Sequence, residues 1–130
     1  MTTQAAAGPA DHRTDDWPTE LRVTKDRAAL AITFESGLSA SIPAELMRVE
    51  SPSAEVQGHS AAGKTLVAGK RGVTIAGVEP IGNYAVRVIF SDGHDTGLFT
   101  WRYLRDLAET GASMMDAYEA ALNAAGLSRD

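Results

Sequence analysis

Residues 83–101 (NYAVRVIFSDGHDTGLFTW) limit the fold of this chain more than any other stretch, because they join a strand pattern, a tight turn and a helix start. The first half, 83–90, alternates its apolar positions and is rich in β-branched and aromatic residues, which predicts a strand. The polar run 91–95 contains an Asp-Gly pair, which is typical of a chain reversal. Helical spacing begins at Trp101, and Thr100 is placed to cap that helix. The rest of the chain is expected to pack around this interrupted strand.

The remaining patterns predict an α+β fold with antiparallel strands in a two-part sheet. Alternating apolar residues between positions 21 and 42 predict a three-stranded meander, and Pro43 suits the start of a short helix at 43–49. A second antiparallel pair includes 83–90. C-terminal helices are predicted at 101–109 and 113–125, with a break at Gly111, because glycine takes a left-handed helix end without strain. The last helix is amphipathic, so it either covers the domain's own sheet or meets its copy in a dimer.

These patterns divide the chain into three parts. Residues 1–16 hold few large side chains and are expected to form a disordered tail. Residues 17–110 form the folded domain, and 111–130 add the C-terminal amphipathic helix. Within the domain, the segment 50–72 contains four glycines and few large apolar residues, which indicates a long loop with a brief strand at 65–68.

The composition excludes several classes of chemistry and partner. The 130 residues contain no cysteine, which removes disulfides, thiolate metal sites and cysteine nucleophiles. The net charge of −5 argues against a nucleic-acid partner, which requires a concentrated basic face. No apolar run of about 18 residues predicts a membrane span. No cationic, apolar leader begins the sequence, so a cytoplasmic location is expected.

No motif identifies a reaction. The nucleophile elbow of the serine hydrolases is missing, and Asp92 precedes His94 in the reverse of the order that an iron-binding facial triad requires. Residues 58–65 (GHSAAGKT) match the phosphate-binding loop pattern, but no apolar strand leads into them and glycines interrupt the segment that follows. The chain is therefore expected not to be an enzyme.

The turn at 91–95 is the best candidate for a site, and two interpretations are open. His94 lies between Asp92 and Asp95, and a neighbouring carboxylate favours the charged imidazolium and can orient a ring nitrogen. The simpler interpretation is a hairpin tip whose aspartates accept hydrogen bonds from backbone amides.

Four blocks of sequence resemble one protein family. They are residues 46–59 (LMRVESPSAEVQGH), 69–75 (GKRGVTI), 78–85 (VEPIGNYA) and 90–97 (FSDGHDTG). In this order, over about 17–107, they are similar to the small stand-alone bacterial proteins of the gamma-butyrobetaine hydroxylase-like N-terminal domain family. The hydroxylases' oxygenase domain is missing here, so the resemblance implies no hydroxylation. A similar domain is fused to Mrp-type iron–sulfur carrier ATPases, which implies an accessory role around metal clusters.

In the hydroxylases this domain resembles a zinc module with three cysteines and one histidine. The resemblance places these ligands at Ser51, Ser53, Val56 and His94. Two hydroxyls and an isopropyl group replace the thiolates, and such groups are poor zinc ligands. We therefore expect neither a zinc site nor another cofactor, although a weakly held divalent metal at His94 and His59 remains an alternative.

If the family fold is retained, the segment 51–59 should lie beside the His94 turn and form a polar cluster. This cluster is either a hydrogen-bonded clasp in place of the metal or a weak site for a divalent ion or a partner. The expected function is a non-catalytic binding or adaptor domain for an unknown protein partner, as a monomer or a homodimer. The alternative is a metal-binding protein. The candidate binding residues are Arg48, Glu55, His59, Asp92, His94 and Asp95.

Overall fold

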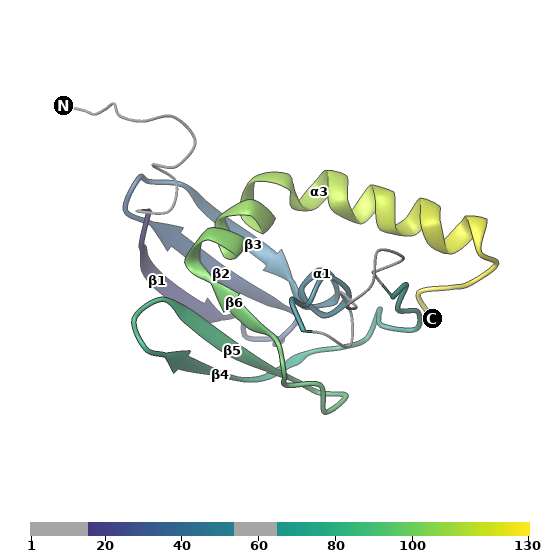
Figure 1. Cartoon of the computed structure of the whole chain (residues 1–130), viewed down its shortest axis with the longest axis horizontal. Coiled ribbons are helices and arrows are strands. Elements are labelled where there is room, and N and C mark those ends of the chain that lie inside the picture. Colours follow the sequence, from purple (N-terminus) through teal and green to yellow (C-terminus); the bar gives the residue numbers. More distant parts are fainter. Residues whose placement is uncertain (1–15, 54–64) are drawn as a thin grey trace.

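The computed structural model describes residues 16–53 and 65–130. Over these residues the chain forms two antiparallel three-stranded sheets, one short helix and one long helix (Figure 1), which confirms the predicted α+β class. The elements are β1 (Pro18–Val23), β2 (Ala29–Phe34), β3 (Ser39–Pro43), α1 (Ala44–Val49), β4 (Ile75–Ile81), β5 (Ala85–Phe90), β6 (Leu98–Thr100) and α3 (Trp101–Ala124).

The first sheet has the order β1-β2-β3, with β2 in the centre. Leu30, Ile32 and Phe34 on β2 are buried, as the alternating pattern predicts. Asp16, which the sequence placed in a disordered tail, is instead part of the fold. Its carboxylate accepts hydrogen bonds from the Ser36 amide at 3.0 Å and the Ser36 hydroxyl at 2.7 Å, and it pairs with Arg105. Residues 1–15 lie outside the described ranges.

The second sheet has the order β4-β5-β6, and its central strand β5 lies within the strand predicted at 83–90. Val86, Val88 and Phe90 are buried while Arg87 is half-buried, which confirms the predicted alternation. Tyr84, which falls inside the predicted strand at 83–90, precedes β5 and is 51% exposed. This sheet carries the 91–95 turn at the end of β5.

Helix α1 follows β3 directly, because Pro43 ends the strand with an extended backbone and cannot continue its hydrogen bonding as a donor. The helix is close to the predicted range 43–49, and its Leu46 and Met47 side chains are fully buried. Residues 50–53 follow the C-terminal end of α1 directly, so this buried helix fixes the position at which they leave the core.

Helix α3 is continuous, so the predicted break at Gly111 is wrong, and the boundary placed between residues 110 and 111 falls inside the helix. The reason is a tertiary contact, because a Cβ at Gly111 would lie 3.1 Å from Leu46 Cδ2. Glycine here lets α3 approach α1 closely instead of ending the helix. The start is as predicted, since the Thr100 hydroxyl accepts a hydrogen bond from the Tyr103 amide at 3.1 Å.

The apolar face of α3 packs on the domain's own core. Leu104 and Leu107 join the main core, whereas Tyr118 and Leu122 form a second cluster with Val49. In Figure 1 the C-terminal residues return beside the segment 65–72, where Gly69 N donates to Ser128 O and Arg71 N to Arg129 O, each at 3.0 Å. The strand predicted at 65–68 is not formed, because these four residues have no strand pairing.

Neither helix within residues 16–53 and 65–130 combines the length and the apolar character needed to cross a membrane.

Candidate functional site

The segment after α1 meets the 91–95 turn through one imidazole and two hydroxyls. Ser51 Oγ lies 3.1 Å and Ser53 Oγ 3.2 Å from His94 Nε2, and both serines are buried. We call Ser51, Ser53 and His94 the serine–histidine clasp. The segment therefore lies beside the turn, as the sequence predicts, while Val56 is outside the described residues. The clasp joins the two segments by hydrogen bonds.

Gly97 allows the clasp to close. A Cβ at this position would overlap Ser51 Oγ and would lie 3.1 Å from Pro52 Cδ. Real side chains do not make such contacts, so either the residue 97 backbone or the 51–52 segment would have to move. No sequence pattern indicates this role, because the glycine has an ordinary backbone conformation and its neighbours lie more than 40 positions away.

Tyr103 fixes the clasp from the side of helix α3. Its hydroxyl donates to the Glu50 carbonyl at 2.5 Å, directly before Ser51. Burial raises the pKa of the Tyr103 phenol to about 12, and the nearby charges of Glu50 and Asp106 act in the same direction. The phenol therefore stays protonated and keeps donating over the physiological range. A rigid helix thus holds the start of the 50–53 segment in place.

Asp92 ties together three separate parts of the chain. Its carboxylate accepts hydrogen bonds from Arg48 Nε at 2.8 Å, Lys70 Nζ at 2.6 Å and the His94 amide at 3.1 Å. Burial alone would raise the pKa of the Asp92 carboxyl, but the bonds from Lys70, His94 and Arg48 together hold it well below its usual value. Sequence analysis missed Lys70, because a spacing of 22 residues carries no local signal.

The turn itself has the hairpin-tip geometry of the simpler interpretation. Besides the amide bond to Asp92, Gly93 N donates to Phe90 O at 2.9 Å and Phe90 N to His94 O at 3.0 Å. Gly93 has φ +90°, a conformation that favours glycine. The ring centroids of His94 and Phe90 are 6.1 Å apart. The backbone of the turn is therefore structural, whereas the His94 side chain is available to the clasp.

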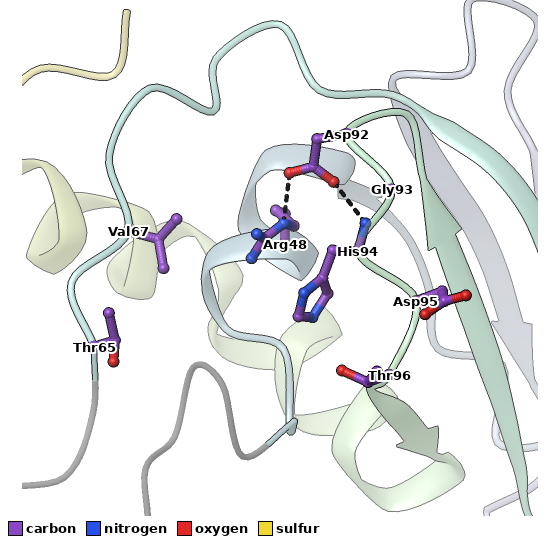
Figure 2. A pocket seen from close by; sticks show the side chains of 8 residues that line it. All are labelled: Arg48, Thr65, Val67, Asp92, Gly93, His94, Asp95 and Thr96. Carbon is purple, nitrogen blue, oxygen red and sulfur yellow. Dashed lines mark hydrogen bonds and ion pairs between the residues drawn. The ribbon is translucent and has the colours of Figure 1, made fainter.

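A cavity of about 430 Å³ opens beside the clasp. Figure 2 shows Arg48 and His94 in the space between the 65–67 segment and the turn, with the Asp95 carboxylate pointing away from the His94 ring. Within the described residues, Arg48 Nη1 is buried and has no hydrogen-bond partner. The cavity is lined by Arg48, Thr65, Val67, Asp92, Gly93, His94, Asp95 and Thr96.

The structure therefore brings four of the predicted residues, Arg48, Asp92, His94 and Asp95, to one cavity. Glu55 and His59 lie outside the described residues. Across residues 16–53 and 65–130, no three His, Asp or Glu side chains are grouped so that they could hold a metal ion. Thr65, Val67 and Thr96 also line the cavity, and no sequence pattern had indicated them.

A second cavity of about 340 Å³ lies on the other side of the same segment, against α3. It shares Thr65 and Val67 with the first cavity, and Met114, Ala117 and Ala121 contribute from the helix. The Tyr118 hydroxyl donates to Val67 O at 2.5 Å and so holds the wall between the two cavities.

The fold and the site together define a small α+β domain whose polar centre is closed by hydrogen bonds between a loop and a hairpin turn. The family model described as gamma-butyrobetaine hydroxylase-like, N-terminal, matches residues 21–105, and the chain belongs to this family. No curated protein matches the chain.

Several solved structures are similar to this chain. One solution NMR structure is 44% identical, with a TM-score of 0.77 over 88% of this chain and 90% of the other. A second is 40% identical, with a TM-score of 0.77 over 95% and 91%. A crystal structure of a protein of unknown function from Acidithiobacillus ferrooxidans, a member of the DUF971 family, is 38% identical, with a TM-score of 0.60 over 74% and 94%.

Proposed function

We propose that this chain is a non-catalytic binding module that engages a protein partner through the His94 surface, defined by Arg48, Asp92, His94, Asp95 and Thr96. The observation that carries the proposal is the polar cavity beside the clasp, because it gathers charged and polar side chains from α1 and the turn in one concave place. Rigid elements hold these groups, which suits recognition of a partner.

The clasp supports a binding role over a catalytic one. A serine–histidine contact can activate a nucleophile only if the hydroxyl reaches a substrate. Ser51 is 0% and Ser53 5% exposed, so both hydroxyls are enclosed by the fold. His94 Nε2 is within hydrogen-bond distance of those hydroxyls. In this arrangement the imidazole positions the turn. Family membership supports a partner in iron–sulfur or oxygenase metabolism, because related domains are joined to such proteins.

The proposal is tested by affinity capture from native extract of the source cells, with the full chain as bait. We expect a protein that the wild type recovers to be lost or depleted at least fivefold with His94→Ala. Arg22→Gln is the control, because Arg22 is an exposed arginine on β1 that pairs only weakly with Glu20 at 3.6 Å. Equal recovery by His94→Ala and the wild type would reject the His94 surface.

The second candidate function is metal binding by His94 and His59. It is supported by the position of His94 Nε2, which lies 3.1 Å from Ser51 Oγ and 3.2 Å from Ser53 Oγ. The family resemblance places zinc ligands at both of these serine positions. Elemental analysis of protein purified without a histidine tag tests it. Stoichiometric metal that disappears in both His94→Ala and His59→Ala would favour this function over the first, whereas metal content equal in wild type and variants would remove it.

A further inference from the structure

We infer that the cavity beside His94 binds a single carboxylate group, with the Arg48 guanidinium as its anchor. This inference rests on the proposed function, because it assigns the chemistry that a partner presents to the His94 surface. The partner is therefore a protein that inserts an aspartate, a glutamate or its C-terminal carboxylate into the cavity.

The first support is an unused donor. Arg48 bonds Asp92 through Nε at 2.8 Å, and its Nη1 group is buried without a hydrogen-bond partner in the described part of the chain. The Arg48 side chain is only 12% exposed, so water has little access to compensate. A charged donor left unpaired in this way is costly, and a small movement of the Arg48 side chain that brings Nη1 to an acceptor in the cavity would relieve that cost.

The second support is the local balance of charge. Arg48 and Lys70 carry two positive charges, and both contact the single carboxylate of Asp92. Asp95 also lines the cavity, with its carboxylate turned away from the His94 ring (Figure 2). Among the described residues around the cavity, two cations thus balance two carboxylates, so a singly charged carboxylate leaves less unbalanced charge there than a doubly charged phosphate.

The third support is the shape of the donor. A guanidinium is planar and presents several N–H groups in a fork that suits a carboxylate, whereas an ammonium acts as a point charge. Asp92 holds Nε, and helix α1 carries the residue, so the remaining end of the fork has a fixed direction. The cavity of about 430 Å³ has room for a carboxylate-bearing side chain beside Thr65 and Thr96.

The test is an NMR titration of the full, isotope-labelled chain at constant ionic strength. The probes are N-acetyl-glutamate α-amide, which mimics an internal acidic side chain, and N-acetylglycine, which mimics a C-terminus. We expect saturable shifts of the Arg48 side-chain and the Gly93 and Thr96 backbone signals with at least one of them. N-acetyl-glutamine α-amide, the neutral isostere, should bind at least tenfold more weakly. Equal shifts from the neutral probe, or no saturable shift with either acid, would overturn the inference.

Variants assign the binding to Arg48. We expect Arg48→Gln to weaken the acid probe at least tenfold, and Arg48→Lys, which keeps the charge and a bond to Asp92, to weaken it by a smaller factor. Arg22→Gln makes the same charge change on β1 and should leave the affinity unchanged. Backbone spectra establish that each variant is folded. If Arg22→Gln weakens binding equally, the effect comes from net charge alone, and Arg48 is not the anchor. If inorganic phosphate binds as tightly as the acid probe, the cavity is not specific for a carboxylate, and the inference also fails.

The capture experiment separates this inference from the proposed function. If His94→Ala loses the partner and Arg48→Gln retains it fully, the His94 surface stands and carboxylate recognition fails. If both variants retain the partner, the proposed function fails, and the titration alone decides whether the cavity is a carboxylate site.

Discussion

The two ends of helix α1 carry the same kind of pair, an arginine with a carboxylate, and complete it to different degrees. At the first turn, Arg129 donates to Glu45 through Nε at 2.8 Å and Nη2 at 2.6 Å, so the pair is bidentate. At the last turn, Arg48, which lines a cavity, donates to Asp92 through Nε, and its buried Nη1 has no partner among residues 16–53 and 65–130. The first pair is typical of a contact that stabilises the fold. The second is typical of a site where a ligand supplies the missing hydrogen-bond acceptor.

The consequences for neighbouring segments also differ. The hydrogen bond from Arg129 to Glu45 raises the pKa of that guanidinium and holds the residues that pair with the 69–71 segment. Asp92 instead joins α1, the 69–71 segment and the His94 turn, so a change there reaches the cavity. Substitutions at the first end should therefore alter stability, whereas substitutions at the second should alter binding.

Arg129→Gln should have the largest effect on stability. Glu45 is only 8% exposed on its side chain, so loss of the arginine leaves a buried carboxylate without its bidentate partner. We expect the free energy of unfolding to fall by about 3 kcal/mol, measured by urea denaturation. Arg71→Gln is the control, because the Arg71–Asp130 pair is exposed and should contribute less than about 1 kcal/mol. Equal losses in the two variants would refute the contrast.

Gly97→Ala should have the next largest effect, because the new Cβ would overlap Ser51 Oγ in the clasp. We expect a loss of about 2 kcal/mol in urea denaturation, together with shifts of the His94 ring signals in NMR spectra. Gly111→Ala is the comparison. Its Cβ would meet only the flexible end of Leu46 at 3.1 Å, and a gain in helix propensity of about 1 kcal/mol offsets the strain. A larger loss at position 111 than at 97 would contradict this.

Tyr103→Phe should cost about 1 kcal/mol, because the Glu50 carbonyl loses its donor before the clasp. The free energy of unfolding of the wild type should also decrease at alkaline pH, and the variant should lack this decrease. The phenol pKa is about 12 in the folded state against about 10 when unfolded, so its stabilisation is complete below pH 10 and is lost as the pH rises toward 12. Denaturation curves at several alkaline pH values measure this. Parallel declines in both proteins would exclude Tyr103 as the cause.

Asp92→Asn should give the smallest change in stability, no more than about 1 kcal/mol at neutral pH, because asparagine keeps a side-chain oxygen that can still accept from Arg48 and Lys70. The wild type has the lower carboxyl pKa in the folded state, so its stabilisation is complete above the unfolded value of about 4 and is lost as the pH falls below it. The difference between wild type and variant should therefore shrink in acid. If the difference in the free energy of unfolding stays constant from pH 7 to pH 2, the Asp92 carboxylate does not stabilise the fold through its ion pairs with Arg48 and Lys70.

Local patterns were enough to predict most of the elements. The β5 alternation, the Thr100 cap and the short helix after Pro43 depend on neighbours within a few positions, and the structure confirms each of them. The family resemblance also predicted that Ser51 and Ser53 lie beside His94, although no local pattern joins residues 41 and 43 positions apart. Glu55 and His59 stay predictions, because they lie outside the described residues.

The sequence by itself determined the α+β class, the helix at the end of β3 and the turn that presents His94, because backbone preference and side-chain periodicity act over a few residues. Only the tertiary structure decided that α3 runs through Gly111, that Gly97 makes room for the clasp, and that one Arg48 donor has no partner in the described part of the chain. Each of these depends on which atoms from distant parts of the chain come into contact, and packing alone sets those contacts.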